Sequence, residues 1–232
     1  MFDLNPTKQN KVIMHYTKKI AGYLLIATTI LFSSCDSGLK DIDGNSYKIV
    51  KIGTRVWMAE NLNVSRFRNG DSIPEVKSSE EWIKLGQEGK PACCKYQYDS
   101  EKAKVYGKLY NWFALNDPRG LAPKGWHVST DEEWTELINF MGGGVIAALN
   151  MRSVGAAESG NTSKEGGFLA LPGGCSNNNG AFSGIGSYCN WWSSTGLNTS
   201  SAWMRQLNCL KCDITSLGRD KIFGFSVRCI KN

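Results

Sequence analysis

The chain has 232 residues, and its 27 Lys and Arg residues against 21 Asp and Glu residues give a formal net charge of +6. A balance this close to neutrality gives no electrostatic reason to expect a nucleic-acid partner, so that class of function is set aside. Eight Trp, eight Tyr and nine Phe residues supply the bulky side chains that dominate burial in a core.

The first 35 residues have the layout of a bacterial lipoprotein signal. A segment with four lysines precedes an apolar run at 20–32, and Ser33 and Ser34 lead directly into Cys35. The apolar run has 13 residues, whereas roughly 20 are needed to cross a hydrocarbon core, so it is a removable signal and not a membrane span. Small residues directly before a cysteine resemble the bacterial lipobox, which implies cleavage before Cys35 and acylation of that residue.

Two details of this leader leave alternatives open. Phe32 departs from the Leu that is usual in the lipobox, so an ordinary secretory signal is the alternative, and Met14 is a second candidate for the translation start. Cleavage removes four Lys and one Asp and leaves 23 basic and 20 acidic residues, a net charge of about +3. We therefore expect a lipid-anchored protein of the cell envelope, in the outer membrane, on its periplasmic side or at the cell surface.

The mature chain begins with a short polar tether at 36–40. No linker rich in Pro, Ser or like charges divides residues 41–232, so we expect a single domain there. At its start the Asp43-Gly44 pair favours a tight turn, and strands are predicted at 47–52 and 55–58. The domain therefore opens with a two-stranded ribbon.

Three helices are predicted in the first half of the domain. One covers 79–85, where serine and acidic residues satisfy the free amides of the first turn. The other two follow from apolar residues at i, i+3, i+4 and i+7, the spacing that lines one face of an α-helix. These sets are Tyr106, Leu109, Tyr110 and Phe113, and Trp134, Leu137, Ile138 and Met141. Asp117-Pro118 ends the first set, whereas a capping box at Thr130 begins the second and glycines at 142–144 end it.

Short aromatic and β-branched runs separated by Gly, Asn and Ser predict strands in the second half. They cover 168–171, 191–195, 202–205 and 223–230. In the last run apolar residues alternate with small or polar ones, which predicts a half-buried strand with one apolar face. Helices in the first half, with strands at both ends and in the second half, define an α+β domain.

Seven ordered segments of this domain resemble a known family. They are Asp41–Tyr47, Trp57–Leu62, Tyr106–Trp112, Leu121–Val128, Leu171–Gly174, Trp192–Thr195 and Gly224–Cys229. They are similar to the Fibrobacter succinogenes major paralogous domain, which occurs on exported proteins and lipoproteins of Bacteroidetes and Fibrobacteres. The resemblance implies a C-type lectin-like fold, related also to the formylglycine-generating enzyme, with two helices packed on a twisted antiparallel sheet and long irregular loops. It implies no particular activity.

The relation to C-type lectins suggests sugar binding, although the sequence lacks the motifs that would hold calcium, a tryptophan followed directly by Asn-Asp and a Glu/Gln-Pro-Asn/Asp segment. Binding without calcium needs an exposed aromatic ring for stacking and polar side chains for the sugar hydroxyls. The candidates are Trp191, Trp192 and Trp203 for stacking, with Asn178 and Asp213 for hydrogen bonding. The competing interpretation is that these tryptophans pack in the core and that the asparagines beside Gly180 form a turn.

Cysteines form the second candidate site. Once Cys35 is acylated seven remain, and export to an oxidising compartment permits disulfides among them. Those in the second half of the domain are Cys175, Cys189, Cys209, Cys212 and Cys229. The Cys209-x-x-Cys212 pair resembles the active cysteines of the formylglycine-generating enzyme, although four residues separate the cysteines in that enzyme. A structural disulfide, a redox centre and half of a zinc site are the other interpretations.

Nothing else in the sequence indicates catalysis. His127 is the only histidine left after cleavage, so a histidine metal cluster cannot form, and we interpret it as structural. Glu132 and Glu133 are better explained as favourable charges at a helix N-terminus than as a general acid and base. We expect no catalytic residue, metal or cofactor. The expected function is a non-catalytic binding or adhesion module for a glycan or a surface protein, with a cysteine-dependent oxidoreductase and a structural envelope component as alternatives.

Overall fold

The computed structural model describes residues 38–152 and 167–232. The predicted lipoprotein signal, Cys35 and the start of the predicted tether lie outside these residues. Within them helices alternate with sheets whose named strands all pair antiparallel, so the predicted α+β class is confirmed. None of the helices in the described part of the chain is both long and apolar enough to cross a membrane.

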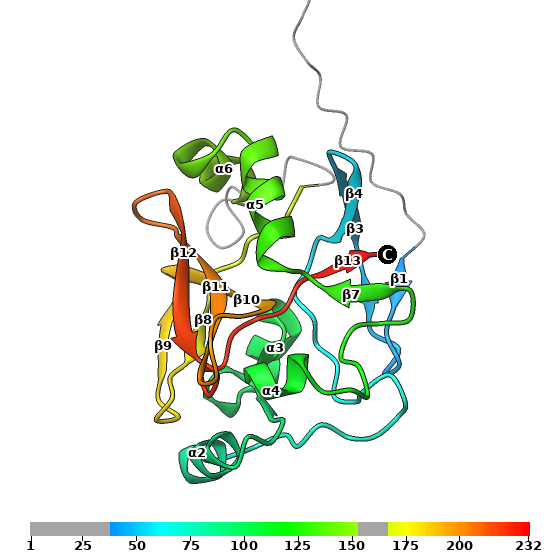
Figure 1. The fold of residues 1–232 in the computed structure, drawn as a ribbon, viewed down its shortest axis with the longest axis vertical. Helices are drawn as coiled ribbons and strands as arrows, with labels where there is room; N and C mark the ends of the chain where they lie inside the picture. Colours follow the sequence, from blue (N-terminus) through cyan, green and yellow to red (C-terminus); the bar gives the residue numbers. More distant parts are fainter. Residues whose placement is uncertain (1–37, 153–166) are drawn as a thin grey trace, which may run out of the picture. The chain divides into compact units, whose positions relative to one another are not determined.

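A four-stranded sheet brings the two ends of the domain together. Its strand order is β3-β4-β13-β7. These strands cover Ile49–Ile52, Arg55–Met58, Cys229–Lys231 and Trp126–Val128, respectively. The predicted opening ribbon is therefore confirmed as β3 and β4, and a hairpin of β1 (Leu39–Lys40) and β2 (Ser46–Tyr47) precedes it. Figure 1 shows the C-terminal strand β13, in red, between this ribbon and β7.

A three-stranded sheet, in the order β10-β11-β12, forms the other large element. Its strands cover Tyr188–Gly196, Ser201–Asn208 and Asp213–Asp220, and the predicted strands at 191–195 and 202–205 lie in the first two. Two-stranded pairs accompany it: β8 (Gly173–Ser176) with β9 (Phe182–Ile185), and β5 (Cys93–Cys94) with β6 (Leu109–Tyr110). The strand predicted at 168–171 is wrong, because only Ala170 forms a bridge there, with Arg152.

Two of the predicted helices are confirmed. Helix α2 (Ser79–Gln87) has Ser78 as its N-cap, and α5 (Asp131–Phe140) begins with the predicted capping box of Thr130 and Glu133. The glycines at 142–144 do not simply end α5: Gly142 and Gly143 adopt positive φ, and a further helix, α6 (Gly144–Met151), begins at once. That helix was not expected, because three glycines in a row favour the end of a helix over the start of another.

The helix predicted from Tyr106 to Phe113 is wrong. The chain instead forms α3 (Ser100–Tyr106), then β6, then the single turn α4 (Trp112–Leu115). Gly107 separates them with φ of 75°, and a Cβ at this position would lie 2.8 Å from the carbonyl oxygen of Leu62. The apolar spacing arose from two short elements and not from one helical face, because the chain must pass close to another backbone at Gly107.

The segment from 223 to 230, called the seam below, connects the two large sheets of the domain. It forms regular strand only in β13, while single bridges join Phe225 to Tyr110, Gly224 to Ser176 and Ser226 to Trp191. Residues 224–230 are all buried, so the expected half-buried strand with one polar face is wrong. Both faces are covered because the segment passes between the two sheets and carries bonds to each.

The polar residue Arg228 is accommodated within this seam by neutral acceptors. The side chain of Arg228 is fully buried, and it donates to Asn61 Oδ1 at 2.7 Å and to the carbonyl oxygens of Met58 and Leu169. Its guanidinium also lies 4.4 Å from the ring centre of Phe168. Burial lowers the pKa of Arg228 to about 9, which leaves the group charged at neutral pH.

Candidate functional site

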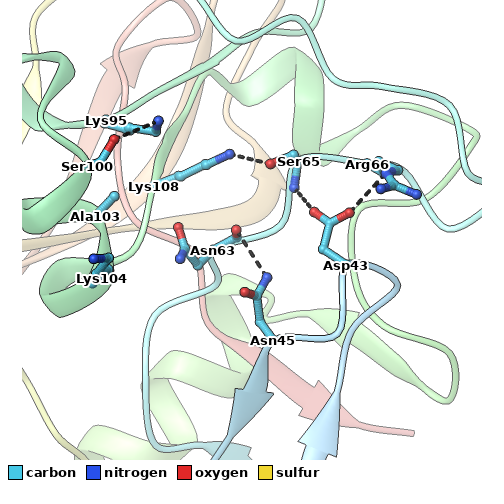
Figure 2. Close-up of a pocket in the computed structure, with 10 residues that line it drawn as sticks. All are labelled: Asp43, Asn45, Asn63, Ser65, Arg66, Lys95, Ser100, Ala103, Lys104 and Lys108. Atoms are coloured by element: carbon cyan, nitrogen blue, oxygen red, sulfur yellow. Dashed lines mark hydrogen bonds and ion pairs between the residues drawn. The ribbon is translucent and has the colours of Figure 1, made fainter.

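A polar groove of about 330 Å³ opens where the β1–β2 turn faces α3. Its walls come from the turn, from the irregular segment after β4, and from the chain between β5 and β6. The lining residues are Asp43, Asn45, Asn63, Ser65, Arg66, Lys95, Ser100, Ala103, Lys104 and Lys108. Figure 2 shows lysines on one side, the pair of Asp43 and Arg66 on the other, and the two asparagines between them.

Asp41 holds the turn that forms one wall of the groove. Its carboxylate accepts the backbone N–H groups of Asp43 at 2.9 Å and Asn45 at 3.0 Å, and the Asn45 side-chain amide at 2.7 Å. Tyr47 donates its hydroxyl to the same carboxylate, and burial, together with this bond, raises the pKa of Tyr47. The tyrosine therefore stays protonated as a donor, and the turn is rigid.

Asp43 connects this turn to the facing segment. Its carboxylate accepts the backbone N–H of Ser65, and its Oδ1 lies 3.1 Å from Nε of Arg66. Asn45 also donates to the carbonyl oxygen of Asn63 at 3.3 Å. These bonds hold residues 63–66 against the turn, so the side chains of Asp43 and Asn45 set the shape of this part of the groove.

Two lysines on the opposite wall share one carboxylate. Lys108 is only 4% exposed, and its Nζ lies 2.5 Å from Glu75 Oε2 and also donates to the hydroxyl of Ser65. Nζ of Lys95 lies 3.0 Å from the other oxygen of Glu75 and donates to the hydroxyl of Ser100. Burial alone would raise the pKa of Glu75, but the bonds and charges of the two lysines outweigh it and hold that pKa below its usual value. One positive charge is therefore left in excess at this wall.

The groove also contains a buried acceptor. Oδ1 of Asn63 is covered from solvent and has no hydrogen-bond partner among the described residues. A buried carbonyl oxygen without a donor costs free energy, about 1–3 kcal/mol. With Asn45, Ser65 and Ser100 nearby, the groove offers both donors and acceptors to a bound molecule.

The aromatic candidates Trp191 and Trp192 are wrong as stacking surfaces. Both side chains are fully buried. The indole N–H of Trp191 donates to Asn61 Oδ1 at 2.9 Å, and that of Trp192 donates to the carbonyl oxygen of Tyr110 at 2.8 Å. Trp191 also stacks on Trp134 with ring centres 5.3 Å apart. A ring enclosed in the core has no free face for a sugar, so the competing core interpretation holds for these two residues.

The other three glycan candidates lie at the surface but apart from one another. Trp203, in the middle of β11, is partly exposed opposite Gly218, whereas Asp213 begins β12 opposite Asn208. Five strand positions separate them, roughly 17 Å at the usual rise. Asn178 is exposed in the tight turn between β8 and β9, as the turn interpretation predicted. None of the three lines the groove.

The Cys209-Leu210-Lys211-Cys212 segment is the turn between β11 and β12. Asn208 Oδ1 accepts the backbone N–H groups of Leu210 and Lys211, each at 3.0 Å, which shapes the turn. The pair thus lies in a turn that joins two strands. A redox motif of this spacing normally lies at the start of a helix instead. Among the described residues no three His, Cys, Asp or Glu side chains are arranged to hold a metal ion.

The remaining predicted cysteines fall into two groups. Cys175 and Cys229 are buried in the core cluster around Tyr110, and burial raises the pKa of both thiols. Cys189 and Cys209 belong to the cluster around Trp191 instead. The structure therefore brings Cys189 and Cys209 together and separates them from Cys175 and Cys229.

His127 connects the end of the chain to α5. Its Nε2 lies 2.9 Å from Glu133 Oε1 and its Nδ1 lies 2.7 Å from Asn232 Oδ1. Glu133 in turn accepts the backbone N–H of Thr130 and pairs with Arg55 at 2.8 Å. The contacts support the structural interpretation of His127 and the helix-capping role of Glu133.

The groove itself was missed from the sequence. Its residues come from three separate segments, and all but Ala103 are ordinary polar residues of loops or a helix. A signal was nevertheless present, because Lys108 is a charged residue between Gly107 and Leu109 inside a segment that also supplies core residues. A lysine in such a position is rarely buried unless it is paired.

The sequence model of the Fibrobacter succinogenes major domain family matches residues 50–231. The chain belongs to this family. No curated protein and no solved structure matched the chain.

Proposed function

We propose that this protein is a cell-envelope lipoprotein whose domain is a non-catalytic binding module, and that the polar groove binds an acidic glycan. Hydroxyl, amide and ammonium groups line the groove together. Hydroxyl and amide groups both donate to and accept from sugar hydroxyls, and ammonium groups pair with a carboxylate or a sulfate. This mixture favours a hydroxyl-rich anion over an extended protein segment, which would seek apolar pockets or a free strand edge.

The observation that carries the proposal is the pairing of Lys95 and Lys108 with the single carboxylate of Glu75. A ligand anion beside these lysines would balance the excess charge in a partly desolvated place, where an ion pair is stronger than on an open surface. The side chains of Asn45, Ser65 and Ser100 in the same groove would exchange hydrogen bonds with ligand hydroxyls. Both features favour a ligand that carries a negative charge and several hydroxyl groups.

The location and the wider fold relationship belong to the same proposal. Acylation of Cys35 would tether the domain to the outer membrane through the few residues that precede β1. The C-type lectin-like fold is supported by the pairing of the opening ribbon with the last strand, β13, and by the long irregular segment between β4 and α2. In such a domain the irregular segments carry binding residues on a rigid base.

The experiment is a glycan array probed with the purified chain, with calcium and with chelator. We expect binding to glycans that carry carboxylate or sulfate groups, equal in both conditions and weakened by salt. Lys95→Met should abolish this binding, while Lys124→Met, which removes an exposed lysine outside the groove, should leave it unchanged. Equal binding by the two variants would place the site elsewhere, and binding only to protein ligands would favour the adhesion alternative.

A further inference from the structure

Two sulfur atoms meet at one end of the β10–β11 pair. Cys189 is the second residue of β10, and Cys209 directly follows β11. Their Sγ atoms lie 3.8 Å apart. Since a disulfide bond is about 2.05 Å long, a shift of about 2 Å, which side-chain rotation can provide, would join them.

The backbone pairing places both side chains on the same face of the sheet. Cys189 is opposite Leu207, and the Cys209 N–H donates to the carbonyl of Ser187 at 2.9 Å. Opposite residues of an antiparallel pair share a face, as do alternate residues of one strand. Cys189 and Cys209 are therefore diagonal neighbours whose main chains are already held by the sheet.

The two thiols have different reactivity. A hydrogen bond between the two sulfurs lowers the pKa of Cys209 against the opposing effect of burial, and the charge of Arg152 adds to the lowering. The same bond, together with burial, raises the pKa of Cys189. Cys209 is also the more exposed of the pair. Cys209 is therefore the thiol of the pair that more readily forms a thiolate, the form that attacks a disulfide.

The nearest competitor, Cys212, has other contacts. It ends the β11–β12 turn with φ of 50°, and its Sγ lies 2.8 Å from Nη1 of Arg152. Its sulfur also contacts the carbonyl oxygen of Cys209. Cys175 is occupied separately, by Ser183 in the β8–β9 pair. These contacts leave Cys189 as the partner that the fold presents to Cys209.

We propose that Cys189 and Cys209 form a disulfide bond that closes the β10–β11 pair, by exchange with a low-molecular-weight or protein disulfide. The Cys209 thiolate attacks one sulfur of that oxidant, forms a mixed disulfide and releases the first thiol. Cys189 then loses its proton, attacks the Cys209 sulfur and displaces the second thiol. The protein gives up two electrons and two protons, the oxidant is reduced to two thiols, and Cys212 stays a thiol. This inference is independent of the polar groove.

The test is a peptide map of the full chain after equilibration with oxidised glutathione and alkylation of free thiols. Trypsin cuts after Arg205 and Lys211, so Cys209 is released in the peptide 206–211, apart from Cys212 in the peptide 212–219. We expect peptide 206–211 to be linked to peptide 165–205. That partner also contains Cys175, so Cys175→Ser should retain the link and Cys189→Ala should lose it. Linkage to peptide 212–219, or alkylation or glutathione on Cys209 in most molecules, would overturn the assignment.

A second measurement compares the thermal stability of the oxidised and the reduced wild-type chain. A disulfide that closes the loop from Cys189 to Cys209 should stabilise the folded state by about 3 kcal/mol. Reduction of the oxidised wild-type chain should therefore lower its Tm by roughly 6–12 °C. Cys189→Ala should show no change in Tm on reduction. An unchanged Tm in the wild type, with the link present in the peptide map, would show that the bond forms without constraining the chain and would overturn its role in closing the strand pair.

Discussion

Two buried cations, Arg228 in the seam and Lys108 at the groove, are accommodated in opposite ways. Arg228 is enclosed and its guanidinium donates to neutral oxygens, those of Asn61, Met58 and Leu169. Lys108 faces a groove and shares the carboxylate of Glu75 with a second lysine. The first arrangement is complete within the protein, whereas the second leaves one positive charge that a partner could balance. Burial of a charge therefore does not by itself identify a site; its remaining hydrogen-bonding capacity does.

The largest effect is expected when Arg228 is replaced and its enclosed hydrogen bonds are lost. Arg228→Met should lower the free energy of unfolding by about 3–5 kcal/mol, because the buried carbonyl groups of Met58 and Leu169 lose their donor. Urea denaturation followed by fluorescence measures the change. Arg66→Met is the matched control, since its side chain is 53% exposed, and should cost under about 1 kcal/mol. A cost as small for Arg228→Met would mean that the seam accepts an apolar side chain.

Removal of the second cation should affect binding more than folding. Lys108→Met should weaken acidic-glycan binding by about tenfold or more, because a charge-assisted hydrogen bond contributes about 1.5–3 kcal/mol. Stability should fall by only about 1–2 kcal/mol, since Glu75 keeps Lys95 as a partner. Titration of a glycan identified on the array, together with urea denaturation, separates the two effects. Loss of stability with unchanged affinity would make Lys108 purely structural, like Arg228.

The pH dependence of stability sharpens the contrast further. The pKa of Glu75 is lowered in the folded state, so its contribution is present above the unfolded pKa of about 4.3 and is lost as pH falls through the folded value. Wild type should therefore lose about 0.5–1 kcal/mol more than Glu75→Gln between pH 6 and pH 3. Denaturation curves across that range measure it. If stability falls equally with pH in wild type and in Glu75→Gln, then Lys95 and Lys108 do not stabilise the ionised carboxylate of Glu75.

The smallest effect is expected at the sheet surface. Trp203→Ala should change stability by about 1 kcal/mol or less and leave acidic-glycan binding unchanged, because the ring is partly exposed and lies outside the groove. A comparison of the glycan affinities of Trp203→Ala and Lys95→Met tests this directly. If Trp203→Ala weakens binding and Lys95→Met does not, the β10–β12 sheet is the binding face and the groove is not.

Local patterns were predicted well where one short segment decides the structure. The capping box at Thr130, the β3–β4 ribbon and the turn beside Asn178 depend on neighbours in sequence, and each is present. The helix through Tyr110 failed because its apolar spacing is shared by two elements that Gly107 separates. The groove could not be predicted, since Asp43 and Lys108 meet only after the β1–β2 turn packs beside the chain before β6.

The sequence by itself determined the family, the α+β class, and the helices and strands whose signals are local. Tertiary structure alone decided which tryptophans are enclosed, which two cysteines meet, and which polar residues form a groove. The physical reason is that periodicity and capping act over a few residues, whereas burial and charge pairing depend on segments far apart in sequence. Arg228 and Lys108 look alike as isolated cations, and only their surroundings make one a structural element and the other a candidate for recognition.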